Sequence, residues 1–139
     1  RASRTDQSSR TVPTRWCPMA MNWEKLKARY EAASLVAQID SIGMNLVRLQ
    51  TLAESGIEES VAQHLVRESQ FFIEWSVPGL NLETNMTLVQ ELLSLQRLLS
   101  RWKLNWPSLW TSPTERQKIA DTAQHWYEHL QGYSSAIAS

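Results

Sequence analysis

His64 and Glu68 are the two titratable side chains in this sequence whose placement best suits a polar site. They lie one helical turn apart in the segment 58–75, and both fall in the middle of the side on which its apolar residues gather. Side chains at this spacing meet on a helix surface, and each can relieve the cost of burying the other. The pattern predicts a structural pair in the core or at a subunit interface, a polar site for proton chemistry or a metal, or a partly hydrated face.

Residues 125–129 read His-x-x-Glu-His, which is the spacing of the inverted zinc-peptidase signature. In a peptidase of that kind His125 and His129 would bind zinc and Glu128 would be the general base. The predicted helix places these three on the side opposite Trp126, and a catalytic zinc needs a third ligand in a sheltered cavity. We therefore expect both histidines to be surface residues without a catalytic function.

Other catalytic patterns are missing from the sequence. Carboxylate-bridged di-metal bundles need Glu-x-x-His on two helices, and this motif does not occur. With four glycines there is no glycine-rich phosphate loop, and no serine–histidine–acid set is recognisable. We expect no catalytic residue, no metal and no cofactor.

Tryptophan is abundant, with seven in 139 residues, and Trp102, Trp106 and Trp110 cluster around a proline. Tryptophan buries a large area and has a polar handle, which makes it common at interface hot spots. The cluster predicts either a plug at one end of a helical bundle or a groove for a partner or ligand. Arg101 and Lys103 flank it, but 14 basic residues balance 14 acidic ones, so we do not expect nucleic acid as a partner.

The element that precedes His64 is predicted to be one long helix, residues 23–54, with an apolar seam at alternating steps of four and three residues. Asn22 can cap its start and Ser55-Gly56 can end it. The Gly/Ser neighbourhood at 41–43 predicts a kink; otherwise the first half of the helix overhangs the bundle.

Three further helices are predicted at 58–75, 83–103 and 113–131. The last begins with a capping box after Ser112, and Gly132 is expected to end it. Short connections make neighbouring helices antiparallel. The predicted fold is all-α: an antiparallel up-down-up-down four-helix bundle with a long first helix.

Two of the predicted helices have more apolar surface than a monomer needs. The segment 83–103 has a second apolar stripe beside its first, and the first helix has apolar residues opposite its main seam. Spare apolar surface marks interfaces. We therefore predict a homo-oligomer, or else a monomer in which the N-terminal arm or long loops cover these stripes; the predicted interface residues are Leu88, Leu95, Leu99, Trp23 and Tyr30.

Residues 1–20 are basic and poor in aliphatic side chains, and we expect a disordered or cloning-derived leader, with a functional basic arm or a transit remnant as alternatives. Residues 21–133 are predicted to form the bundle domain, and 134–139 a C-terminal tail. No apolar run approaches the ~20 residues that span a bilayer. Cys17 is the single cysteine, which fits a reducing compartment. We therefore expect a cytoplasmic protein that does not bind membranes.

These observations predict a non-enzymatic helical protein–protein interaction module that self-associates through apolar helix faces. The alternative is a small-molecule- or metal-binding enzyme with a polar site at His64 and Glu68 inside the bundle. The candidate binding residues are His64, Glu68, Trp102, Trp106 and Trp110.

Overall fold

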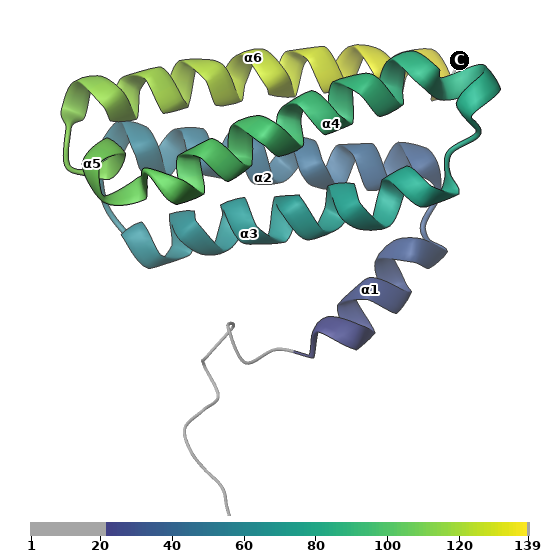
Figure 1. Ribbon diagram of the computed structural model, residues 1–139, viewed down its shortest axis with the longest axis horizontal. Coiled ribbons are helices and arrows are strands. Elements are labelled where there is room, and N and C mark those ends of the chain that lie inside the picture. Colours follow the sequence, from purple (N-terminus) through teal and green to yellow (C-terminus); the bar gives the residue numbers. More distant parts are fainter. Residues whose placement is uncertain (1–21, 139) are drawn as a thin grey trace, which may run out of the picture.

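The computed structural model describes residues 22–138, which are helical throughout apart from short connections, with no strand (Figure 1). The expected leader at 1–20 lies outside the described residues. The prediction of an all-helical fold is confirmed, but the predicted number of four helices is wrong. The elements are α1 (Trp23–Ala32), α2 (Leu35–Ser55), α3 (Glu59–Ser76), the 3₁₀ turn η2 (Val77–Gly79), α4 (Leu82–Leu104), α5 (Trp106–Trp110) and α6 (Pro113–Ala138).

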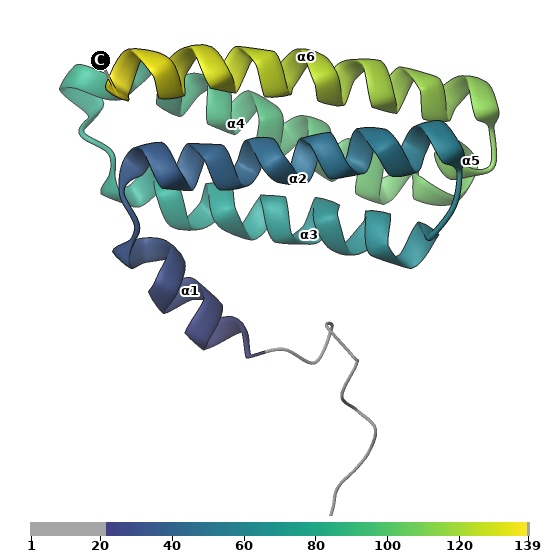
Figure 2. The same ribbon diagram turned by 180° about the vertical axis from the view of Figure 1, so that it is seen from behind.

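Four long helices, α2, α3, α4 and α6, lie side by side, and α1 leaves them at one end (Figures 1 and 2). Arg116 near the start of α6 donates to the carbonyl of Ala53 near the end of α2. Ser134 near the end of α6 is 2.8 Å from a carboxylate oxygen of Asp40 near the start of α2. These two helices are therefore antiparallel.

The predicted first helix is two helices, because the chain turns at Ala33 and Ser34. Ala33 is extended (φ −77°, ψ 158°), and the Ser34 hydroxyl caps α2 by accepting from the Ala37 amide. The side chain of Gln38 donates to the carbonyl of Ala33 and to that of Tyr30, which also accepts from the Ala33 amide at the end of α1. Ser34 thus begins a new helix at a point where the apolar seam continues and gives no sign of a break.

The kink predicted at 41–43 is wrong, since α2 runs through this segment without a break. Gly43 has a packing role instead: a Cβ atom there would lie 3.3 Å from Cδ1 of Tyr127 on α6. Ala120 and Ala123 on α6 are fully buried. Small side chains of this kind allow α2 and α6 to approach closely.

The predicted helix starts are confirmed at Asn22, whose side chain accepts from the Glu24 amide, and at Ser112, which accepts from the Glu115 amide. The end at Gly56 is confirmed too, with a left-handed φ of 72°. The end predicted at Gly132 is wrong, because α6 continues to Ala138. Buried Ser134 and its contact with α2 hold the last turns in place.

The core lies between the four long helices and is built mainly from aliphatic side chains, with aromatic rings toward its ends. The most deeply buried large side chains are at most 2% exposed, and they include Ile39, Ile42, Leu46, Leu49, Ile73, Leu88, Leu92, Leu95, Leu99 and Leu130.

Within residues 22–138, no helix is both long and apolar enough to cross a membrane.

Candidate functional site

The structure brings His64 and Glu68 together on α3. Nε2 of His64 is 3.6 Å from Oε2 of Glu68, and the two side chains are 11% and 14% exposed. That distance allows an electrostatic contact but is too long for a hydrogen bond. The carboxylate has a closer partner on the neighbouring helix, since Nδ2 of Asn45 on α2 donates to its Oε1 over 3.0 Å. Glu68 therefore links α3 to α2 through Asn45, a residue that is 4% exposed.

The other side of the His64 ring lies against α1, with the Trp23 ring centroid 5.8 Å away. Nδ1 of His64 is buried and has no hydrogen-bond partner among the described residues. The contact of this ring with α1 is therefore an aromatic one and not a hydrogen bond.

Beside this pair, α2 and α3 border an open groove of about 540 Å³. A second hollow of about 350 Å³ adjoins it along α2, and both are lined by Arg48 and Glu68. We call the two together the α2–α3 groove. Its lining residues are Asp40, Ser41, Met44, Asn45, Val47, Arg48, Thr51, Leu52, Val61, His64, Leu65, Glu68 and Phe72.

The rim of the α2–α3 groove carries large apolar side chains in solvent. Met44 is 49% exposed and Val61 is 41% exposed. Ile57, in the connection between the two helices, does not line the groove but is also 56% exposed. Arg48 is exposed and forms no ion pair or hydrogen bond with residues 22–138. The surface thus combines apolar contact area with one cation that has no partner among these residues and two hydrogen-bonded anions, Asp40 and Glu68.

The tryptophan cluster lies at the end of the helices where α5 connects α4 to α6. Trp102, Trp106 and Trp110 are 7%, 3% and 5% exposed, and the last two rings stack with centroids 5.1 Å apart. Nε1 of Trp106 donates to Glu59 over 2.9 Å. Arg116 donates to the carbonyl of Trp110 over 2.8 Å. These rings fill the end of the core, and none of them lines the α2–α3 groove.

The side of α4 that we expected at an interface is its core side. Leu88, Leu95 and Leu99 are 0–2% exposed within one chain, so they offer no surface to a second copy. This helix is apolar over much of its circumference, and its other stripe is mostly exposed, although Val89 on that stripe is buried. Leu82 and Leu93, on that stripe, are 54% and 42% exposed.

The apolar face of α1 is covered by α3 in the same chain. Tyr30 is 5% exposed, and its ring stacks on Phe72 with centroids 4.3 Å apart. Trp23 is half-buried against Phe71, at 4.7 Å. The apolar residues opposite the main seam of the predicted first helix therefore serve an intramolecular contact, made possible by the turn at Ser34.

His125 and His129 are exposed on α6, as predicted. Their rings stack with centroids 6.1 Å apart, and Nε2 of His129 lies 3.3 Å from a carboxylate oxygen of Glu91 on α4. Across the described part of the chain, no three His, Cys, Asp or Glu side chains are grouped so that they could hold a metal. The zinc-peptidase reading has no geometric support.

The sequence analysis missed Asn45 and Arg48, because neither stands out among the polar residues of its own helix. Both matter only because α3 packs beside α2, and the pattern of a single helix does not predict which helix packs beside it. The sequence matches no protein-family model, no curated protein and no solved structure. Function therefore has to be inferred from the geometry of this chain.

Proposed function

We propose that this protein is a non-enzymatic helical interaction module that binds a second copy of itself through the α2–α3 groove. Its four long helices would form an antiparallel up-down-up-down bundle, with α1 as an addition to α3. The single cysteine fits the reducing cytoplasm as its compartment. The observation that carries the proposal is Arg48, which has no partner among residues 22–138 and lies beside Glu68 in a groove with an exposed apolar rim.

A groove with both charges can be complementary to itself. In a two-fold symmetric dimer the same patch meets its own copy, so residue i contacts j and j contacts i. Arg48 of one copy would then face Glu68 of the other, twice over. Charge pairs of this kind fix the register of an interface more than they add affinity.

The apolar rim would supply the affinity of such a dimer. Met44 and Val61 each lose contact with water when a second copy covers the groove, and burial of apolar area drives association. The chain carries no net charge, with 14 residues of each sign, so two copies do not repel one another at long range.

Sedimentation velocity across the micromolar range tests this proposal. We expect the wild-type protein to shift from monomer to dimer, and Arg48→Glu and Glu68→Lys each to remain monomeric. An equimolar mixture of the two variants should dimerise, because each charge then meets its opposite. A wild-type protein that stays monomeric, or a mixture that fails to recover, would contradict the proposal.

A matched pair of apolar variants covers the case in which Glu68→Lys disturbs the fold. Val61→Asp lies on the groove rim, whereas Leu93→Asp lies on the exposed stripe of α4, and the two side chains are 41% and 42% exposed. We expect only Val61→Asp to abolish the dimer, with both variants folded by circular dichroism. Loss of the dimer in Leu93→Asp alone would assign the interface to α4.

The rival function, an enzyme with a polar site at His64 and Glu68, has weaker support. A catalytic site needs several polar groups that converge on one position. Half of the residues that line the groove beside His64 are apolar, namely Val47, Leu52, Val61 and Leu65, and they form most of its exposed wall. We therefore favour the binding module.

A further inference from the structure

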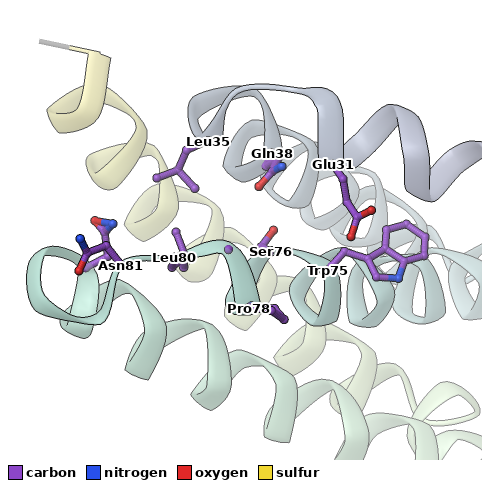
Figure 3. A pocket seen from close by; sticks show the side chains of 10 residues that line it. Glu31, Leu35, Gln38, Trp75, Ser76, Pro78, Leu80 and Asn81 are labelled. Atoms are coloured by element: carbon purple, nitrogen blue, oxygen red, sulfur yellow. The ribbon is translucent and has the colours of Figure 1, made fainter.

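A further hollow, separate from the α2–α3 groove, lies at the opposite end of the helices from the tryptophan cluster, where the α1–α2 connection meets the end of α3, η2 and the start of α4 (Figure 3). Its volume is about 590 Å³, which is within the range of small-molecule sites. In the view of Figure 3, Glu31 and Trp75 lie toward one side and Asn81 toward the other, with Gln38 and Ser76 between them. None of these residues lines the α2–α3 groove.

The hydrogen-bonding capacity that Gln38 offers to this cavity follows from its other contacts. Its Nε2 donates to the carbonyls of Tyr30 at 3.0 Å and Ala33 at 3.3 Å. A primary amide has two N–H donors, so both are used at the end of α1. Only the Oε1 atom, an acceptor, remains for a ligand.

The hydrogen-bonding capacity of Ser76, which is 3% exposed and lines the cavity, can be worked out in the same way. The Tyr30 hydroxyl lies 3.1 Å from the backbone carbonyl oxygen of Gln38 and 2.6 Å from the Ser76 hydroxyl. A phenol has one proton, and the carbonyl can only accept it. The Ser76 hydroxyl therefore donates to Tyr30, and its own free lone pair is an acceptor.

Glu31 and Trp75 add a negative charge and an aromatic face. The Glu31 carboxylate is exposed and forms no hydrogen bond or ion pair with residues 22–138. Of the described residues that line the cavity, none is lysine, arginine or histidine. Cations bind over indole rings, most strongly where a carboxylate is also near. This side of the cavity therefore selects a positively charged group that carries several donors.

We propose that this cavity is a binding site for an aliphatic primary amine in its ammonium form. The three N–H donors of the ammonium match three of the acceptors that line the cavity, namely the Glu31 carboxylate, Gln38 Oε1 and the Ser76 hydroxyl. The alkyl chain would lie against Trp75. A quaternary ammonium ion has the charge but no donor, and an alcohol has a donor but no charge.

Titration of the ¹⁵N-labelled full chain with n-butylammonium, followed by NMR, tests the proposal. We expect saturable shifts in the millimolar range that centre on Gln38, Ser76 and the Trp75 indole. Tetramethylammonium and 1-butanol, at the same ionic strength, should bind at least about tenfold more weakly, since each lacks one of the two recognition elements. Equal responses to all three probes, or shifts spread over the acidic surface, would overturn the proposal.

Glu31→Gln provides the decisive variant because this side chain is exposed and bonds to no described residue. We expect it to weaken n-butylammonium binding about tenfold, because the charge-assisted hydrogen bond is lost. Glu24→Gln is the matched control on the same helix, outside the cavity, and should bind as the wild type does. Unchanged affinity in Glu31→Gln would contradict the site. The dimer test remains independent, since neither variant touches the α2–α3 groove.

Discussion

Nδ2 of Asn45 on α2 donates a hydrogen bond to Oε1 of Glu68 on α3 over 3.0 Å. Nε2 of His64, one turn earlier on α3, is 3.6 Å from the other oxygen of the same carboxylate. The helix-to-helix contact is therefore the shorter one. The residue that the sequence pairs with Glu68 is not the one that satisfies its hydrogen bonding.

This difference predicts an order of stability among variants. We expect Glu68→Leu to lower the free energy of unfolding by about 1–3 kcal/mol, since it leaves the buried Asn45 amide without an acceptor. The double variant Asn45→Leu/Glu68→Leu should cost less than the sum of the two single changes. Urea denaturation of the four proteins measures this coupling.

His64→Leu supplies the comparison for that cycle. It removes a contact that is no hydrogen bond, together with a buried nitrogen that has no partner among residues 22–138. We expect it to be nearly neutral, and its coupling with Glu68→Leu to be smaller than that of Asn45. A larger coupling for His64 would mean that the ion pair, and not the amide, stabilises this site.

Arg116 predicts a second stability effect, at the other end of α2. Its guanidinium donates to the carbonyl of Ala53 at 3.2 Å and to that of Trp110 at 2.8 Å, so it joins the ends of α2 and α5. Arg116→Met would leave both carbonyls without this partner, and we expect a loss of about 1–3 kcal/mol in thermal or urea unfolding. Lys118→Met, on the exposed side of the same helix, should change the stability by less than about 0.5 kcal/mol. Equal effects of the two variants would show that the joint at Arg116 is unimportant.

Tyr30 predicts a loss of stability in alkali. Burial raises the pKa of its phenol above the ordinary value of 10.0, and the hydrogen bond with Ser76 offsets only part of that rise. The unfolded chain then loses this proton at a lower pH than the folded chain does. The stabilisation is complete below pH 10 and declines above it, by up to about 1.4 kcal/mol per pH unit.

Urea denaturation of the wild type and Tyr30→Phe between pH 8 and about 11 measures this effect. We expect Tyr30→Phe to be less stable at pH 8, because Ser76 loses its partner, but to have a shallower decline above pH 10. Parallel pH profiles for the two proteins would contradict the assignment of the alkaline decline to Tyr30.

Local signals in the sequence were enough to predict most of the helices. The caps at Asn22 and Ser112 and the left-handed Gly56 were found because each acts within one turn of its own helix. The break at Ser34 was missed because the apolar seam continues across it. Helical periodicity indicates which side of a helix is buried. It does not detect a change in the direction of the helix axis when the apolar spacing continues unchanged across the turn.

The candidate site was predictable only where it depends on one helix. The proximity of His64 and Glu68 follows from their spacing on α3, but the position of Asn45 requires the packing of α2 on α3. The same limit explains the error at Leu88, Leu95 and Leu99. Two apolar stripes on one helix do not reveal which of them faces the core, and that choice depends on the neighbouring helices.

Gly132 provides a last prediction, which concerns the end of α6. The helix continues past this glycine to Ala138, and an added Cβ atom at position 132 would meet nothing within 4 Å. Glycine in a helix interior is about 0.5–1 kcal/mol less favourable than alanine because its unfolded backbone has more freedom to lose. We therefore expect Gly132→Ala to raise the free energy of unfolding by that amount.

Gly43→Val is the contrasting substitution, because α2 is equally continuous there but Tyr127 lies in the way. The first carbon added would already be 3.3 Å from the ring, and the two further methyl groups of valine must displace the ring or the helix. Overpacking of this kind costs about 1–3 kcal/mol. Opposite signs for the two variants in urea denaturation would show that close packing of α2 on α6, and not the helical backbone, requires Gly43. A destabilised Gly132→Ala would instead indicate that α6 ends near Gly132, as its sequence suggests.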